Sequence, residues 1–259
     1  GRYRVFQLDV GQELRIDGRV LKIDPHPAAP KIPYGQEGKQ AIVFKISDQV
    51  GDSLALKVFK PRYRRPFLVT ITERMAVYAD LPGMKVCERE VVSPQKHLAV
   101  LKEHPDLSYA AIMPWIEGPT WSEVLLTRHI LTPLESLLLA RSLLQVLISL
   151  EEKGLSHGDL SGVNIMLPHF VGGEGVSLVD VEQLYIPGME KPDILPEGSP
   201  GYGFPRMTGP LWGPFTDRFP GSIILAEMLC FCEKDIIKAS WGESYFPPDE
   251  ICKDTPLYD

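Results

Sequence analysis

The chain has 259 residues, enough for one two-lobed domain or two small ones. Its apolar content of 44% and charged content of 24% are ordinary for a globular protein, and no apolar run approaches a membrane span. A formal net charge of −7 argues against non-specific binding to nucleic acid. The four cysteines are too few and too irregularly placed for a disulfide framework, which favours a reducing, cytoplasmic setting.

The first 60 residues predict an antiparallel sheet. Residues 4–10 and 18–25 have the pattern of short strands, and the proline-rich segment 24–33 links them to the next strands. Residues 34–46 predict a strand, a turn and a second strand at 41–46, and residues 53–60 predict a third strand.

Helical patterns come after the sheet. Residues 65–83 carry apolar side chains at helical spacing and end at Pro82-Gly83. Two capping boxes, Thr120 to Glu123 and Thr132 to Glu135, each predict the start of a helix. The second of these helices is the strongest in the chain and ends before Gly154. Because leucines surround it on nearly every side, we expect it to be deeply buried.

Residues 157–182 concentrate the chemistry of the chain. Asp159 and Asn164 lie five residues apart, after the long helix and at the start of an apolar run. Residues 165–167 and 176–181 flank a glycine-rich turn at 172–175 and predict a β-hairpin, with Asp180 at the end of its second strand. The hairpin therefore brings three oxygen-bearing side chains to one edge, and hard cations such as Mg²⁺ prefer oxygen ligands.

This stretch resembles the catalytic core of the protein kinase-like superfamily. His157-Gly158-Asp159 stands where protein kinases have His-Arg-Asp, Asn164 at their catalytic-loop Asn, and Asp180 at the Asp of Asp-Phe-Gly. The resemblance covers roughly residues 30–235 and implies an α+β, bilobal protein kinase-like fold in a single domain, 1–259. Residues 1–113 are expected to form an N-lobe of antiparallel sheet plus helix C, with a strand extension at 1–30. Residues 114–118 are expected to be the hinge, and 119–259 a mainly helical C-lobe, shortened at its C-terminus.

The resemblance also implies an ATP site. Lys57 stands at the lysine of the Val-Ala-Ile-Lys strand, which pairs with the α- and β-phosphates, and Glu73 is chosen as the helix-C glutamate that orients it. Gly38 is the one glycine of the usual phosphate-covering loop that falls at a matched position. The remaining residues implied to contact ATP are Val43, Ala55, Met113 as gatekeeper, Pro114 and Ile116 of the hinge, and Met166.

The catalytic and metal-binding roles are implied in the same way. Asn164 and Asp180 are implied to hold Mg²⁺, and Asp159 to orient and deprotonate the acceptor hydroxyl. His157 is implied to support this loop. Asp217 begins a segment that resembles the start of helix F in kinases, where a buried Asp holds the backbone of the catalytic loop.

Departures from the pattern leave alternatives open. Ser161 stands where protein kinases have a lysine that contacts the γ-phosphate. The motifs HGD at 157–159 and VDVE at 179–182 are similar to those of aminoglycoside phosphotransferases. Residues 198–202 and Pro205-Arg206 resemble the end of a protein-kinase activation segment, which that small-molecule branch lacks. The sequence predicts an atypical, bacterial-type Ser/Thr protein kinase that uses ATP and Mg²⁺ on a protein substrate. A further domain or partner could supply missing C-lobe contacts. The alternatives are a nucleotide-binding pseudokinase acting as a regulatory module, and a small-molecule kinase.

Overall fold

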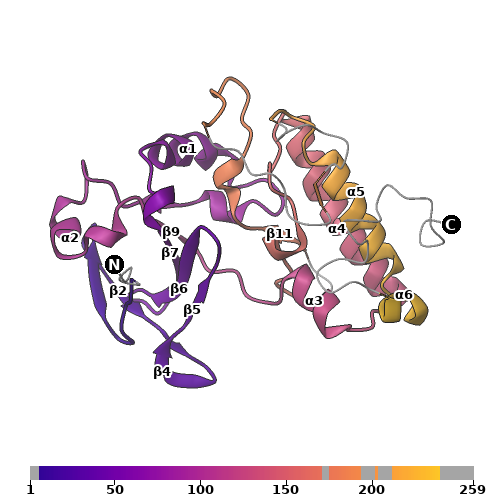
Figure 1. The fold of residues 1–259 in the computed structure, drawn as a ribbon, viewed down its shortest axis with the longest axis horizontal. Coiled ribbons are helices and arrows are strands. Elements are labelled where there is room, and N and C mark those ends of the chain that lie inside the picture. The colour runs from indigo at the N-terminus through magenta and orange to yellow at the C-terminus, as the bar shows by residue number, and fades with distance from the viewer. Residues whose placement is uncertain (1–5, 171–174, 194–201, 204–211, 240–259) are drawn as a thin grey trace. The chain divides into compact units, whose positions relative to one another are not determined.

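A computed structural model describes residues 6–170, 175–193, 202–203 and 212–239 (Figure 1). The chain divides into two compact units, which we call the sheet unit (1–77 and 86–115) and the helical unit (78–85 and 116–259). An antiparallel sheet followed by helices confirms the predicted α+β class. Three predicted features, the glycine turn at 172–174, residues 198–201 and Pro205-Arg206, lie outside the described residues.

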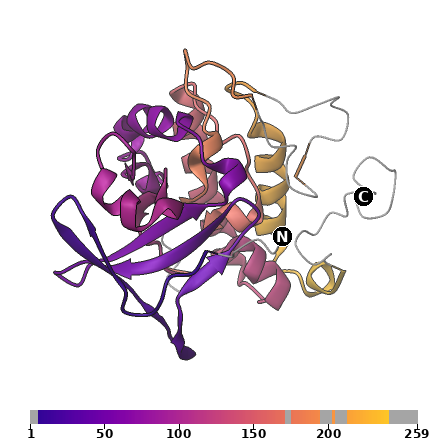
Figure 2. The same cartoon turned by 60° about the vertical axis from the view of Figure 1, so that its left-hand side comes forward.

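A seven-stranded antiparallel sheet forms the sheet unit, with order β1-β2-β6-β7-β9-β8 and β5 paired to β6. Its twist is visible in Figure 2. The predicted strands at 41–46 and 53–60 are confirmed. The strand bounds are β1 Glu13–Ile16, β2 Arg19–Ile23, β5 Gly35–Glu37, β6 Ala41–Ser47, β7 Ser53–Phe59, β8 Glu90–Val91 and β9 Ala111–Pro114.

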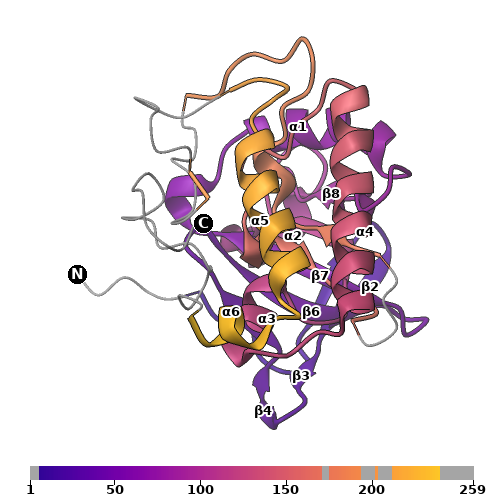
Figure 3. The ribbon, with the colours of Figure 1, turned by 90° about the vertical axis from the view of Figure 1, so that its right-hand side faces the viewer.

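Two predictions for the N-terminal segments are wrong. Residues 6–10, the described part of the expected strand 4–10, are not a strand, and the first strand starts at Glu13. A tight turn comes after it, because Asp17 and Gly18 adopt φ of 52° and 75°, the backbone conformation that two-residue hairpins favour. The proline-rich segment is more than a link: β3 (Pro25–His26) and β4 (Ala29–Pro33) pair as a separate small sheet (Figures 1 and 3).

The core of the sheet unit lies on one face of the main sheet. Strand alternation places Phe44, Leu56 and Ile112 opposite one another in neighbouring strands, and all three are buried. Leu14 and Leu21 of the β1–β2 hairpin belong to the same buried cluster. The first strands therefore complete this core, a role that the sequence alone left undetermined.

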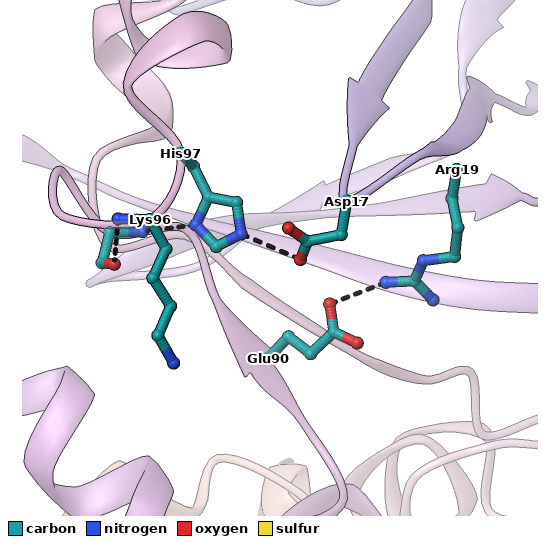
Figure 4. A network of polar contacts seen from close by, with 6 residues as sticks. Asp17, Arg19, Glu90, Lys96 and His97 are labelled. Atoms are coloured by element: carbon teal, nitrogen blue, oxygen red, sulfur yellow. Dashed lines mark hydrogen bonds and ion pairs between the residues drawn. The ribbon is translucent and has the colours of Figure 1, made fainter.

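Two polar contacts show that the sheet curls (Figure 4). Arg19 of β2 forms an ion pair of 2.7 Å with Glu90 of β8, although four strand spacings separate them, about 19 Å in a flat sheet. His97, at the start of α2 (Leu98–Glu103), bonds through Nε2 to Asp17 in the β1–β2 turn at 2.9 Å. The β1–β2 hairpin is thus brought to β8 and to the segment that follows it.

The first predicted helix is shorter than expected. The pattern at 65–83 becomes α1 (Phe67–Met75) followed by a 3₁₀ turn at Ala76–Tyr78, so the regular helix ends before Pro82 is reached. Leu68, Ile71 and Met75 are its buried residues, spaced as one helical face requires.

The helical unit contains α3 (Trp121–Thr127), α4 (Pro133–Glu152), α5 (Arg218–Cys230) and α6 (Lys234–Ala239). Both predicted capping boxes are present with both of their hydrogen bonds, at Thr120 and Thr132. Strands β10 (Ile165–Met166) and β11 (Ser177–Leu178) form the predicted hairpin. Helices α4 and α5 pack against each other (Figure 3).

The expected deep burial of α4 is wrong. Leu143 and Leu150 are at most 1% exposed, whereas Leu137 and Leu144 are 56% and 44% exposed, so only one side of the helix is covered. With 20 residues and a mean hydropathy of 1.4, α4 also meets the length and composition of a membrane span, contrary to the expectation that no run approaches one. Those two properties are shared by core helices, and α4 packs on α5 as a core helix does.

Candidate functional site

The face of the sheet opposite to the core gathers the predicted nucleotide residues of the sheet unit. The strand registers align Val43, Lys57 and Ala111 in one row, and Lys45, Ala55 and Met113 in the next. Residues directly opposite one another in antiparallel strands share a face. Val43, Ala55, Lys57 and Met113, predicted separately, are therefore neighbours.

Lys57 is buried on this face. Its side chain is 5% exposed, and Nζ lies 5.5 Å from the centroid of the Phe59 ring. A strand lysine is ordinarily a solvated charge, and removing an ammonium group from water is costly unless a partner compensates it. Lys57 is therefore a buried ammonium group that lies beside an aromatic ring.

The other predicted residues of the sheet unit are placed less favourably. Glu73, the predicted helix-C glutamate, lies in the last turn of α1, and its side chain is exposed. Gly38 lies in the turn between β5 and β6, where its N–H donates to the carbonyl oxygen of Ala41 at 2.8 Å. That N–H is thus already used inside the turn.

The predicted hinge residues lie at the division between the units. Pro114 ends β9, opposite Leu54 of β7, and Ile116 is the first residue after the division. Met166 lies in β10 and forms an isolated bridge with Thr120, inside the helical unit.

His157 organises the loop of the helical unit that carries Asp159, the predicted catalytic base. Its Nδ1 accepts a hydrogen bond from the N–H of Asp159 at 3.2 Å, so the proton of a neutral ring must be on Nε2. Nε2 then donates to the carbonyl oxygen of Val179 at 2.7 Å. The buried imidazole therefore links the loop that carries Asp159 to the segment that carries Asp180.

Asp217, directly before α5, binds the backbone of the same loop. Its carboxylate accepts the N–H of His157 at 2.6 Å and that of Gly158 at 3.1 Å, and it makes no side-chain cap of α5. Burial raises the pKa of Asp217, against the opposing influence of His157 and these two N–H groups. The side chain thus tethers the loop through two backbone N–H groups.

Asn164 is the best-defined candidate ligand. Its side-chain Nδ2 donates to the backbone carbonyl oxygen of Asp159 at 2.8 Å. Its backbone carbonyl oxygen accepts the N–H of Val179 at 2.9 Å. The side-chain Oδ1 is buried and has no hydrogen-bond partner among the described residues. Asp180 follows Val179 directly, with φ of 57° and an exposed side chain.

These oxygens suit Mg²⁺. An orphaned buried carbonyl oxygen is costly, and a cation would satisfy it. Within the described part of the chain, no group of three or more His, Cys, Asp or Glu could hold a metal ion. A site of two protein oxygens fits Mg²⁺, which usually keeps several waters and takes further oxygens from phosphates.

Three features were missed from the sequence. Gly158 adopts φ of 86°, and a Cβ there would lie 2.4 Å from the carbonyl oxygen of Gln183, so an arginine cannot replace it without a shift. Lys45 lies on the same sheet face as Val43 and Lys57, with Nζ 5.5 Å from the ring centroids of both Tyr34 and Trp115. Lys45 is two residues from Val43 in the same strand, so the alternation of side chains could have placed both on one face. Arg89, which contacts Met113, left no such pattern in the sequence, because β8, directly after it, has only two residues.

Comparisons with known proteins identify the fold. No family model matches the sequence, and no curated protein matches it. Among solved structures, the kinase domain of PF14_0431 is similar with a TM-score of 0.61 and 15% identity, over 86% of this chain and 67% of that one. Vaccinia related kinase 3 is similar with a TM-score of 0.54 and 17% identity, over 87% and 69%. The chain therefore has a kinase-like fold.

Proposed function

We propose that the protein is an ATP- and Mg²⁺-dependent phosphotransferase, an atypical Ser/Thr protein kinase that phosphorylates a protein hydroxyl. The observation that carries this proposal is the buried Oδ1 of Asn164, which lacks a partner among the described residues while the rest of that side chain is fixed. Asn164 is bonded through its Nδ2 to the carbonyl oxygen of Asp159, and through its backbone carbonyl oxygen to the N–H of Val179, the residue before Asp180. This is an arrangement that positions oxygen ligands and a base together.

Each residue has a defined task in this proposal. Asp159 accepts the proton of the acceptor hydroxyl as the hydroxyl oxygen bonds to the γ-phosphorus and ADP departs. Lys57 binds the α- and β-phosphates, and His157 and Asp217 keep the loop in place. Asn164 and Asp180 would hold Mg²⁺, which supplies neutralisation of the developing phosphoryl charge.

The test is transfer of labelled phosphate from γ-labelled ATP with Mg²⁺ to the protein itself or to a generic protein substrate. Wild type should label protein, and Asp159→Asn should lose at least about a hundredfold in rate, because its amide cannot accept the proton. Asn164→Ala should also lose transfer and should bind ATP without its Mg²⁺ dependence. Labelling that survives Asp159→Asn would contradict the assignment of the base.

A second candidate is a nucleotide-binding pseudokinase. Glu73 is exposed, although a glutamate that orients a buried lysine is expected to be covered, and the N–H of Gly38 is already bonded. Ser161 stands in place of a γ-phosphate lysine, and its buried hydroxyl has no partner among the described residues. Tight ATP binding that Lys57→Ala weakens, without any transfer, would favour this candidate. ATP consumption without protein labelling would instead indicate a small-molecule acceptor.

A further inference from the structure

Two buried oxygen atoms without a partner belong to one short turn of the helical unit. The 3₁₀ turn Gly162–Asn164 begins directly after Ser161. Ser161 and Asn164 are 1% and 3% exposed. Neither Oγ of Ser161 nor Oδ1 of Asn164 has a hydrogen-bond partner in the part of the chain that the structure describes. Because a buried polar oxygen costs free energy when it is left unbonded, this pair calls for a ligand.

The backbone explains why the Ser161 hydroxyl is left over. A serine directly before a helical turn ordinarily accepts the N–H of the second or third residue of that turn with its side-chain oxygen. Here the N–H of Asn164 donates to the backbone carbonyl oxygen of Ser161 at 3.1 Å, and the side chain makes no such cap. The hydroxyl oxygen is therefore not used by the turn that it precedes.

The same turn relates the two oxygens to each other. Side chains three residues apart lie on one side of a 3₁₀ turn, and Ser161 and Asn164 have this spacing. The amide of Asn164 cannot rotate freely, because its Nδ2 is bonded to the carbonyl oxygen of Asp159. The turn thus presents one hydroxyl oxygen and one fixed amide oxygen together.

We propose that the hydroxyl of Ser161 is a third protein ligand of the Mg²⁺ that Asn164 and Asp180 would hold. This inference rests on the proposed function, in which Asn164 binds that metal. Hydroxyl and amide oxygens are the hard ligands that Mg²⁺ prefers, and a Ser or Thr hydroxyl holds Mg²⁺ in P-loop nucleotide sites. With this added oxygen, the site binds a divalent cation before any nucleotide supplies phosphate oxygens.

The experiment titrates the whole chain with Mn²⁺ in the absence of nucleotide and follows free Mn²⁺ by electron paramagnetic resonance. Mn²⁺ is the probe because it takes the same oxygen ligands as Mg²⁺. Wild type should show saturable binding that Mg²⁺ displaces and that Asn164→Ala abolishes. Ser161→Ala should raise the Kd by about tenfold or more, as loss of a residue that supports a metal site does. Ser136→Ala is the matched control, since Ser136 of α4 is also 1% exposed and its Oγ also lacks a partner among the described residues.

A sulfur substitution separates a metal ligand from a residue with a merely structural role. Ser161→Cys replaces a hard oxygen by a soft sulfur, which prefers Cd²⁺ to Mn²⁺. The Kd for Mn²⁺ divided by the Kd for Cd²⁺, measured as displacement of bound Mn²⁺, should rise by about tenfold or more over wild type. Ser136→Cys should leave this ratio unchanged. A change in stability alone would weaken both cations equally, and an unchanged ratio in Ser161→Cys would therefore contradict the inference.

The remaining outcomes separate this inference from the function on which it rests. If Asn164→Ala abolishes Mn²⁺ binding while Ser161→Ala stays within about twofold of wild type, the hydroxyl is not a ligand and the inference is wrong. If wild type binds Mn²⁺ only when ATP is added, the inference is again wrong, but the proposed function stands. If Asn164→Ala binds Mn²⁺ as wild type does, with and without ATP, the metal site of the proposed function is itself wrong.

Discussion

Gly158 shows how a single backbone carbonyl group can restrict which residue fits in the loop before Asp159. Its φ of 86° and the carbonyl oxygen of Gln183, 2.4 Å from where a Cβ would be, leave room for glycine alone. The 3₁₀ turn Val181–Gln183, directly after Asp180, is what brings that oxygen close. An arginine at position 158 would therefore require the chain after Asp180 to shift.

Replacement of Gly158 by alanine should therefore cost more than backbone strain alone. The matched control is Gly175→Ala in the same unit, where φ is 81° but no atom lies within 4 Å of the new Cβ. The control should lose about 1–2 kcal/mol of unfolding free energy, and Gly158→Ala at least about 1 kcal/mol more. Denaturant unfolding followed by circular dichroism measures both. Equal losses of unfolding free energy would show that the Gln183 carbonyl group can move away from the new Cβ without destabilising the fold.

The raised pKa of Asp217 predicts a specific pH dependence. The folded state holds the proton more tightly than the unfolded chain, so the contribution of this group to stability falls as the pH rises above about 4. The stability advantage of wild type over Asp217→Asn should therefore be smaller at pH 7.5 than at pH 4.5. Unfolding at a series of pH values measures the difference, in which groups common to both proteins cancel. An advantage that grows with pH would contradict the assigned direction.

At the scale of elements, α4 illustrates the limit of periodicity as a guide to burial. Leucines surround the helix, yet α5 covers one side of it and leaves Leu134, Leu137, Leu144 and Ile148 between 44% and 64% exposed. Hydrophobicity states which side chains would gain from burial. Only the neighbouring elements determine which of them obtain it.

Two adjacent leucines of α4 provide the test. Leu143 is fully buried, so Leu143→Ala should destabilise the protein by about 2–5 kcal/mol through lost packing and the cavity left behind. Leu144 is 44% exposed, and Leu144→Ala should cost less than about half as much. Thermal or denaturant unfolding distinguishes them. Similar costs would mean that this face of α4 is covered in solution.

At the scale of the whole molecule, two units of different construction carry the candidate site residues. The sheet unit is a curled sheet in which the β1–β2 hairpin contacts β8 through Arg19 and Glu90, and the start of α2 through Asp17 and His97 (Figure 4). The helical unit is built on α4 and α5, and Asp217 at the start of α5 holds the loop at His157 and Gly158. Each unit positions its own share of the candidate residues.

The contact between Asp17 and His97 and the ion pair between Arg19 and Glu90 should contribute differently to stability. His97 is buried and accepts the N–H of Ser93 at 3.0 Å, so His97→Ala leaves that N–H unpaired and should cost about 1–3 kcal/mol. The Arg19–Glu90 pair is 34% and 50% exposed, and Arg19→Ala should cost less than about 1 kcal/mol. Hydrogen exchange of the amides of β1 and β2 reports both effects. Faster exchange in Arg19→Ala than in His97→Ala would reverse this order.

Much of the fold and of the candidate site could be predicted from local patterns. The spacing of Asp159, Asn164 and Asp180, the capping boxes at Thr120 and Thr132, and the strands at 41–46 and 53–60 all depend on neighbours close in the chain. Such features are encoded by side-chain periodicity and by backbone preferences. For the same reason, the kinase-like resemblance could be found before any coordinates were known.

What the sequence by itself determined is which chemical groups exist and in what order: an oxygen-rich loop at Asp159 and Asn164, a strand lysine and an α+β succession of elements. Only the tertiary structure decided that Gly158 must be glycine, that one side of α4 is exposed and that Arg89 reaches Met113. Each of these depends on atoms brought together from positions far apart in the chain. Such contacts are set by register and packing, which leave no local pattern in the sequence.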